Sequence, residues 1–417
     1  MKAGVITIGD ELLLGQTINT NLAKIGMAFG EVGVSVIQSC TIMDSREGIL
    51  EVLDNMLSKF ELVVITGGLG PTNDDVTKEV LTEYFQSELI LNEEVLAHIR
   101  NIFESKGRVM VPSNIDQAKV PKDCEILWNP LGTAPGMWFE KQNKIVISLP
   151  GVPYEMENLL KTEVIPKLKS ISIASRKYYR TIMTQGIGES FLAEKISDWE
   201  NRIYKDGMSL AYLPSPGMIR LRITTENKNK DKEKIDAYIK EITDRLPQYV
   251  YANEDVSIFQ IVGELLKEEK ATLSTVESCT AGGIANAFTA FSGSSTFFKG
   301  GFITYSNTLK MKLANVTAQS LDKYGAVSEQ MAKEMAIGGR KELETDYCIS
   351  VTGIAGPTGG SEEKPVGTVW IAVASSQGVV TEKFILGNDR GRNIQRSILC
   401  AANVLRRVIL GITRSNH

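Results

Sequence analysis

The stretch that decides the fold runs from residue 62 to residue 75 and reads Leu62-Val63-Val64-Ile65-Thr66-Gly67-Gly68-Leu69-Gly70-Pro71-Thr72-Asn73-Asp74-Asp75. Its first five residues are apolar or β-branched, which predicts a buried strand. A glycine-rich turn follows, and a helical pattern begins at the acidic end of the stretch. A strand that passes through a tight turn into a helix is typical of a parallel sheet with helices on its faces.

The same alternation extends on both sides of this stretch, over roughly the first 165 residues. We predict a doubly wound α/β domain over residues 1–168, with a mostly parallel sheet. Its strands are expected at 4–8, 34–40, 62–66, 125–128 and 144–149. Its helices are expected at 19–30, 47–57, 75–85 and 93–103.

Two further domains are expected after residue 168. Residues 169–254 predict a small α+β module, with helices near 190–199 and 235–246 and a strand at 249–251. The lysine-rich run at 227–232 is expected to be a solvated loop at the entry to the second of these helices. Residues 255–417 form another α/β pattern. Its strands are expected at 272–277, 302–305, 347–352, 368–374 and 380–386, and its helices at 258–267, 282–288, from 307, 329–343 and 394–409.

The overall composition excludes several classes of protein. Hydrophobic residues make up 43% of the 417 residues and charged residues 23%, which is typical of a soluble globular chain. The net charge of −4 gives no general attraction for nucleic acid or anionic lipid. No apolar run approaches the roughly 18 residues that span a bilayer, and the first residues predict a strand rather than a signal peptide. We therefore expect a cytoplasmic protein with no membrane partner.

The cysteine and histidine content limits the chemistry. The five cysteines form no C-x-x-C pair and are expected to be reduced thiols. The two histidines, His98 and His417, are too few for a histidine-rich metal site or an ordinary serine–histidine–aspartate triad. A serine nucleophile would therefore need a lysine as its base, and a metal ion would need carboxylate ligands.

Acidic residues follow two strands of the first expected domain. The loops after these strands should share a crevice, because the carboxyl ends of parallel strands meet at one edge of a sheet. The glycines of the second loop permit backbone N–H groups to approach a phosphate, and the acidic side chains provide oxygen ligands for a divalent cation. The glycines are Gly67, Gly68 and Gly70, and the acidic residues are Asp10, Glu11, Asp74 and Asp75. Helix capping explains Asp74 and Asp75 equally well.

Ser278 and Lys310 are the candidate catalytic pair of the last expected domain. Ser278 lies at a strand-to-helix turn, where helix N–H groups would stabilise an oxyanion, although it would also serve there as a helix cap. Lys310 is placed near the first turn of a helix, where the positive helix end and any burial favour the neutral amine that takes a proton from serine. Tyr305 is expected to relay or orient that proton. A lysine on the surface remains the alternative for Lys310.

Several strings resemble the CinA family, the competence/damage-inducible proteins. In the first domain they are Ile8-Gly9-Asp10-Glu11-Leu12-Leu13-Leu14-Gly15, the 66–75 stretch and Ser148-Leu149-Pro150-Gly151-Val152-Pro153. In the last domain they are Glu277-Ser278-Cys279-Thr280, Gly293-Ser294-Ser295, Thr304-Tyr305-Ser306-Asn307, Gly325-Ala326-Val327-Ser328, Gly353-Ile354-Ala355-Gly356-Pro357 and Glu362-Glu363-Lys364-Pro365-Val366-Gly367-Thr368. The resemblance spans essentially the whole chain.

The resemblance implies a fold for each part. The first domain is expected to be similar to molybdopterin-binding proteins, and the middle segment to a KH module. However, Gly186-Ile187-Gly188-Glu189 departs from the G-x-x-G clamp that grips a nucleotide backbone, so a spacer or dimer contact is the expected role of that segment.

The resemblance also implies two hydrolase activities. The last domain would be a nicotinamide-nucleotide amidohydrolase, which converts nicotinamide mononucleotide to nicotinate mononucleotide and ammonia without a cofactor. Ser278 would be the nucleophile, Lys310 the base and Tyr305 its partner, while Gly293, Thr352 and Arg390 would bind substrate. Arg392 competes with Arg390 for the phosphate. The first domain would hydrolyse ADP-ribose to AMP and ribose 5-phosphate with a divalent metal ion, which Asp10, Glu11, Asp74 and Asp75 would hold.

Two alternatives belong to other classes of function. The first domain would be a binding module for a pterin or nucleotide without catalysis, because a fold does not carry an activity. Otherwise the protein would organise partners in DNA uptake, which the acidic balance and the absent clamp argue against. We expect small nucleotides as ligands, no nucleic acid partner, and a homodimer.

Overall fold

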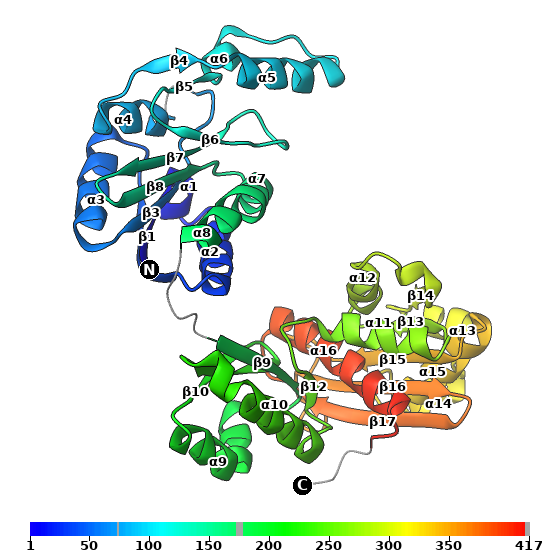
Figure 1. The fold of residues 1–417 in the computed structure, drawn as a ribbon. Helices are drawn as coiled ribbons and strands as arrows, with labels where there is room; N and C mark the ends of the chain where they lie inside the picture. The colour runs from blue at the N-terminus through cyan, green and yellow to red at the C-terminus, as the bar shows by residue number, and fades with distance from the viewer. Residues whose placement is uncertain (73–74, 172–177, 413–417) are drawn as a thin grey trace. The chain divides into compact units, whose positions relative to one another are not determined.

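The computed structural model describes residues 1–72, 75–171 and 178–412. The chain divides into two compact units, Met1–Lys177 and Tyr178–His417 (Figure 1). The second and third expected domains thus share one compact unit, and the division of the chain into three domains stays a prediction. None of the described helices is long and apolar enough to cross a membrane.

The first unit is built on a six-stranded sheet. Its strand order is β2-β1-β3-β8-β7-β6, in which the first four strands run parallel and β7 pairs antiparallel with both of its neighbours. The strands are β1 (Lys2–Ile8), β2 (Ser35–Ile42), β3 (Leu62–Thr66), β6 (Glu125–Leu127), β7 (Gly136–Lys141) and β8 (Lys144–Leu149). The mostly parallel sheet is therefore confirmed.

Helices cover both faces of this sheet, which confirms the doubly wound architecture. Apolar residues of α2 (Thr20–Glu31), α7 (Pro153–Leu159) and α8 (Ile165–Ile171) pack on one face. Those of α3 (Arg46–Lys59) and α4 (Thr77–Tyr84) pack on the other. The remaining elements are α1 (Asp10–Leu13), the hairpin of β4 (Leu89–Leu91) with β5 (Lys119–Pro121), α5 (Glu93–Ser105), α6 (Pro112–Asp116) and the π-helix Leu160–Val164.

The sequence prediction missed strand β7. Its apolar part, Met137 to Phe139, is short and reads like a loop that follows β6. The turn that joins it to β8 has positive φ at Gln142 (52°) and Asn143 (62°), the backbone of a two-residue hairpin turn. Gln-Asn is a weaker signal for that turn than Asn-Gly, so the hairpin was not recognised.

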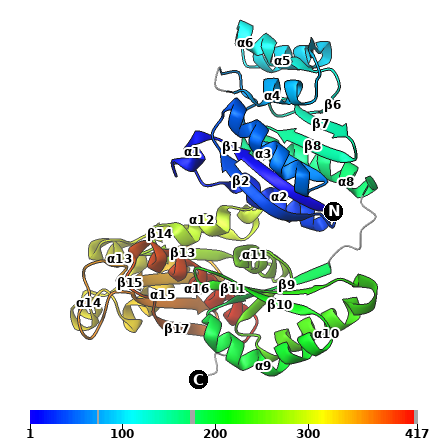
Figure 2. The same cartoon turned by 90° about the vertical axis from the view of Figure 1, so that its left-hand side faces the viewer.

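The second unit begins with a four-stranded antiparallel sheet in the order β10-β11-β9-β12. The strands are β9 (Tyr178–Gln185), β10 (Ser209–Ser215), β11 (Met218–Thr225) and β12 (Val250–Ala252). Helices α9 (Glu189–Lys205) and α10 (Lys228–Arg245) lie on one face of it (Figure 2). Their apolar residues are buried in one cluster with those of the sheet. The run expected as a solvated loop at 227–232 instead forms the first turns of α10, because the side chain of Asn227 caps the helix by accepting the N–H of Lys230.

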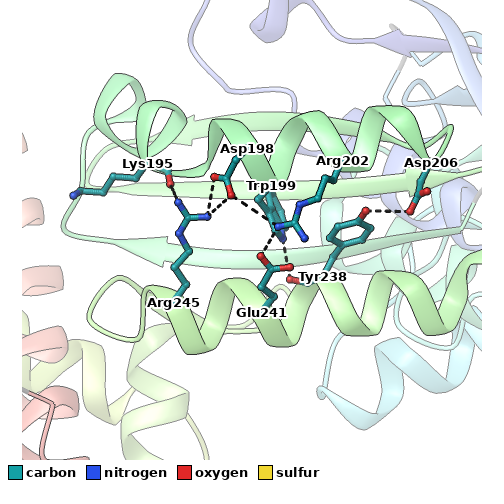
Figure 3. A network of polar contacts seen from close by, with 8 residues as sticks. All are labelled: Lys195, Asp198, Trp199, Arg202, Asp206, Tyr238, Glu241 and Arg245. Carbon is teal, nitrogen blue, oxygen red and sulfur yellow. Dashed lines mark hydrogen bonds and ion pairs between the residues drawn. The ribbon is translucent and has the colours of Figure 1, made fainter.

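Polar contacts tie α9 to α10 (Figure 3). Arg245 donates to both carboxylate oxygens of Asp198 at 2.8 and 3.0 Å, and Trp199 Nε1 donates to the Tyr238 carbonyl at 3.1 Å. Glu241 accepts from Arg202. The exposed pairs contribute little each, so the buried apolar stripe carries most of the stability of this module.

The rest of the second unit is a five-stranded sheet in the order β14-β13-β15-β16-β17. Strands β14 (Phe298–Ile303), β13 (Leu273–Glu277) and β15 (Tyr347–Gly353) are parallel, while β16 (Thr368–Ser375) and β17 (Gly378–Ile385) continue antiparallel. One face packs against α11 (Ile258–Glu268), α12 (Gly283–Thr289) and α16 (Arg390–Ile409), and the other against α13 (Asn307–Ala314) and α15 (Glu329–Glu342). The sequence prediction missed α14 (Ala318–Tyr324).

Candidate active sites

The structure brings Ser278 and Lys310 together. Ser278 follows the last residue of β13, and Lys310 is the fourth residue of α13, which follows the neighbouring strand β14. Lys310 Nζ lies 3.1 Å from Ser278 Oγ and 2.8 Å from the carbonyl oxygen of Thr304. The two side chains therefore meet in one site, at the edge where parallel strands end.

Burial favours the neutral form of the Lys310 amine. The Lys310 residue is 2% exposed, which rules out the surface position that the sequence left open. Burial lowers the pKa of its amine, because the ammonium loses its hydration. The described residues place no carboxylate in an ion pair with Lys310. The fold thus favours the neutral amine, the form that accepts the proton of a hydroxyl.

Cys279, which follows Ser278, is a second candidate nucleophile beside this site. Burial raises the pKa of its thiol to about 12. A thiol with such a pKa is protonated at neutral pH and is a poor nucleophile. Ser278 is therefore the stronger candidate.

Glu277 fixes the turn that carries Ser278, a role that the sequence prediction missed. Its side chain is 1% exposed and accepts four hydrogen bonds. The donors are Thr280 Oγ1 at 2.6 Å and the backbone N–H groups of Gly282, Ile284 and Ala285 at 3.0, 3.0 and 2.8 Å. The sequence signal for this role is an acidic residue one position before a strand-to-helix turn, because its carboxylate can reach the N–H groups that begin the helix.

This arrangement corrects the expected oxyanion donors. The helix N–H groups that were assigned to an oxyanion are bound by Glu277, and the Ser278 N–H donates to the Val351 carbonyl at 3.0 Å. The expected capping role of Ser278 is not seen either, because α12 begins at Gly283 with no side-chain cap. Among the described residues, none accepts a hydrogen bond from the N–H of Cys279 or Thr280. These two N–H groups immediately follow Ser278 in the sequence, which makes them the candidate donors to an oxyanion.

Tyr305 pairs with Arg390 rather than with the dyad. Its hydroxyl accepts from Arg390 Nη2 at 3.2 Å, and its residue is 59% exposed. The expected proton relay from Tyr305 to Lys310 is therefore not formed here, and the Thr304 carbonyl orients the amine instead. Arg390 Nη1 also donates to the Gly356 carbonyl at 2.9 Å.

The structure separates Arg390 from Arg392. Arg390 reaches Tyr305, which lies in the loop between β14 and the helix that carries Lys310. Arg392 lines a different pocket, against the middle module of the chain. Arg390 is therefore the better candidate for a ligand of the substrate phosphate.

The other two residues expected to bind substrate have local roles in the described structure. Thr352 is 1% exposed, and its hydroxyl donates to the Ala326 carbonyl at 2.6 Å. Gly293 adopts a φ of 85° and begins the 3₁₀ turn Ser294–Thr296. A side chain at Gly293 would lie 3.5 Å from Lys267 Nζ and would be strained by that φ.

In the first unit, the two expected loops do lie side by side. β1 and β3 are neighbours in register, and a side chain at Gly67 would collide with the Ile8 carbonyl at 2.3 Å. Gly67 and Gly68 have φ values of 112° and 67°, so the predicted backbone freedom is used there. This confirms that the loops after β1 and β3 meet at one edge of the sheet.

The carboxylates of these loops do not form a cluster among the described residues. Asp10 and Glu11 are exposed at the start of α1. Asp75 Oδ2 accepts from the Thr72 N–H at 3.0 Å and from its hydroxyl, which is a local turn bond. Asp74 lies outside the described residues. Within the described ranges no group of three histidine, cysteine or acidic side chains is placed to hold a metal ion.

A pocket of about 460 Å³ lies beside the glycine loop. Neither Asp10 nor Glu11 is among its described lining residues, which include Gly68, Gly70, Asp75, Lys78, Asp116, Gln117 and Lys119. Burial lowers the pKa of Lys78, whose Nζ donates to the Asp116 carbonyl at 2.8 Å. The sequence prediction also missed Asp44, in the loop after β2. Asp44 Oδ1 accepts from the Val76 N–H at 3.4 Å, next to Gly68.

Three family models match the chain. The probable molybdopterin binding domain matches residues 4–170, the damage-inducible protein CinA KH domain residues 179–252, and the CinA C-terminal domain residues 255–409. The expected fold classes of the three parts are therefore confirmed.

Two similar proteins match over nearly the full chain, and a solved structure matches part of it. A CinA-like protein of Flavobacterium psychrophilum is 42% identical over 98% of this chain and 99% of its own. A putative competence-damage inducible protein of Caldicellulosiruptor bescii is 39% identical over 98% and 100%. The crystal structure of the competence/damage inducible protein CihA from Agrobacterium tumefaciens covers 37% of this chain and 96% of its own, at 34% identity and a TM-score of 0.35.

Proposed function

Because this chain belongs to the CinA family, we propose that its C-terminal domain hydrolyses nicotinamide mononucleotide to nicotinate mononucleotide and ammonia. The family resemblance supplies the substrate. The observation that carries the chemistry is the 3.1 Å distance between Lys310 Nζ and Ser278 Oγ in a buried site. A buried neutral amine beside a hydroxyl is a general base beside a nucleophile.

The proposed reaction proceeds through an acyl-enzyme. Neutral Lys310 accepts the proton of Ser278, and the serine oxygen attacks the carboxamide carbon. The resulting oxyanion receives hydrogen bonds from the N–H groups of Cys279 and Thr280, which no described residue uses. The lysine ammonium then protonates the leaving nitrogen, and ammonia departs. Water cleaves the ester with Lys310 again as the base.

Arg390 is proposed to bind the phosphate of the nucleotide. It is fixed by the Gly356 carbonyl, and its second terminal nitrogen contacts the exposed Tyr305 hydroxyl, which a phosphate would replace or join. A contact far from the carboxamide stabilises the bound substrate and the transition state equally. Arg390→Ala is therefore expected to raise KM about tenfold or more and to change kcat little.

The direct test uses the full chain. Purified protein is incubated with nicotinamide mononucleotide, and the products are identified by mass together with an ammonia assay. Loss of ammonia release in Ser278→Ala, with unchanged thermal unfolding, supports the proposal. Full activity in Ser278→Ala would overturn the assignment of the nucleophile.

For the first unit we propose metal-dependent hydrolysis of ADP-ribose to AMP and ribose 5-phosphate. The support is the family resemblance and the chemistry of the four residues, since carboxylate oxygens are the ligands that Mg²⁺ and Ca²⁺ prefer. The three described carboxylates do not by themselves form a metal cluster, and Asp74 lies outside the described residues. We therefore derive no catalytic step for this unit.

A pocket beside the glycine loop favours a second function for this unit. The unit would bind a pterin or a nucleotide beside its glycine loop, in the pocket of about 460 Å³, without turning it over. Product analysis with ADP-ribose, in added divalent metal and after thorough chelation, separates the two. Unchanged turnover after chelation argues against the metal, and binding without any product supports the binding module.

A further inference from the structure

A second pocket of the Tyr178–His417 unit has no part in either proposed site. Its volume is about 540 Å³, within the usual range for small-molecule sites. It lies where two turns of the four-stranded module meet α16 and the edge strand β17. The residues used below are Gln185, Gly188, Ser215, Phe384, Arg392 and Arg396, all of which line it.

Glycines allow the two turns to approach α16. Gly186, after β9, has a φ of 85°, and Gly217, between β10 and β11, has a φ of 83°. A side chain at Gly217 would lie 3.1 Å from Leu399 Cδ1 and 3.5 Å from Arg396 Cγ. The pocket is thus lined by two parts of the chain that are in direct contact, rather than by a single loop.

Two arginines make one wall of the pocket positive. Arg392 and Arg396 are one helical turn apart on α16. Arg396 Nη1 donates to the Leu386 carbonyl, and its other side-chain N–H groups have no partner among the described residues. Arg392 donates from its backbone to Asp389 Oδ1, and its guanidinium contacts no described partner. Glu189 is the acidic residue among the described lining residues.

The N-terminus of α9 faces the same pocket. This helix has 17 residues, and its N-cap is Gly188, which has no side chain to accept the first N–H groups. Unbound N–H groups and the positive helix end favour an anion. Together with the two arginines, they point to a phosphate group as one part of the ligand.

Apolar side chains from both parts of the chain also line the pocket, together with Lys383 of β17 and with two polar side chains that lack good partners. Phe384 is among its apolar lining residues. Gln185 is 2% exposed, and its side chain donates to Cys400 Sγ at 3.4 Å, a weak acceptor. Ser215 Oγ is buried and has no hydrogen-bond partner among the described residues. A flat body with hydrogen-bonding edges would satisfy both.

We propose that this pocket binds a small phosphorylated compound with a planar, partly apolar body, of the nucleoside monophosphate class. The phosphate lies between Arg392, Arg396 and the start of α9. The body lies against Phe384, within reach of Gln185 and Ser215. The pocket is separate from the proposed catalytic site, because Arg390 of the same helix contacts Tyr305 instead.

The test is a calorimetric titration of the full chain with AMP, with adenosine and with inorganic phosphate. AMP also belongs to the class of ligand proposed for the first unit. The titration therefore measures the number of AMP sites per chain as well as the affinity of each. Charge reversal in Arg392→Glu is expected to weaken one AMP site about tenfold or more, or to remove it. Lys341→Glu, an exposed charge reversal on α15, is the matched control and is expected to leave every site unchanged.

Two results would overturn the proposal. One is an AMP titration of Arg392→Glu that matches the unmodified chain in both site number and affinity. The other is a site sensitive to Arg392→Glu that binds inorganic phosphate as tightly as AMP, because the apolar wall would then contribute nothing. Gln185→Met removes a hydrogen-bonding group that the body of the ligand would reach, so AMP is expected to bind this variant more weakly while phosphate binding is unchanged.

Discussion

The Ser278 turn and the glycine loop of the first unit follow strands of similar parallel sheets, yet they hold their polar groups in opposite ways. Around Ser278 the reactive side chains are buried, bonded to one another and fixed by Glu277. In the glycine loop and its neighbour, Asp10 and Glu11 are exposed and Asp75 is bonded within its own turn. Burial changes the pKa of a reactive group, whereas an exposed carboxylate can be substituted without disturbing a buried network. The comparison predicts which substitutions affect chemistry alone and which also affect stability.

The largest effect is expected where the buried pair is broken. Lys310→Met keeps the length and the apolar environment of the side chain but removes the base, so ammonia release from nicotinamide mononucleotide should fall about 1,000-fold or more. The double variant with Ser278→Ala should be no worse than either single variant, because the two side chains act as a unit. Lys312→Met, an exposed position on the same helix, is the control. A Lys310→Met protein with more than about a tenth of normal activity contradicts the dyad.

The exposed site is expected to lose activity without losing stability. Asp10→Asn should lower ADP-ribose turnover about 100-fold, if this carboxylate is a metal ligand, and leave the melting temperature unchanged, because the residue is exposed. Turnover and melting temperature are measured on the same preparation. A large fall in melting temperature would show that the two regions do not differ as described.

Glu277 should affect both activity and stability. In Glu277→Gln the amide accepts fewer hydrogen bonds and brings its own N–H groups toward backbone donors, so unfolding should become easier by about 2–4 kcal/mol. Because Glu277 positions the Ser278 turn, the substitution should lower kcat about tenfold and change KM less. Glu268→Gln, on exposed α11 surface, is the control. Unchanged kcat in a destabilised Glu277→Gln protein would leave this residue a purely structural role.

The smallest effect is a pH dependence. Burial lowers the pKa of Lys310, so the neutral amine forms at a pH below about 10.4, the pKa of a free lysine. kcat/KM should therefore rise as the pH increases through that lowered pKa. In the folded chain the amine binds fewer protons than in the unfolded chain, so this group's contribution to stability also rises with pH, up to the unfolded pKa. The free energy of unfolding of Lys310→Met should lack this pH-dependent contribution. Activity that falls as pH rises from 7 to 9 would contradict a neutral amine base.

Much of the fold was predictable from periodicity and glycine turns, because buried parallel strands such as 62–66 and 144–149 are continuous apolar runs. The elements that were missed, such as β7 and α14, are short and depend on turn geometry or on packing against neighbours. The Ser278–Lys310 pair was predictable because both follow adjacent strands of one sheet. The roles of Glu277 and of the Thr304 carbonyl depend on where a side chain turns, which residue types alone do not determine.

The buried Cys279 thiol has a consequence for the protein under oxidative stress. Peroxide and alkylating agents attack thiolates, and a cysteine whose pKa is raised to about 12 offers almost none at neutral pH. A hydroxyl nucleophile resists the same reagents. The proposed amide chemistry is therefore expected to continue under conditions that inactivate enzymes with a cysteine nucleophile, although a sulfur atom is adjacent in sequence to the reacting oxygen.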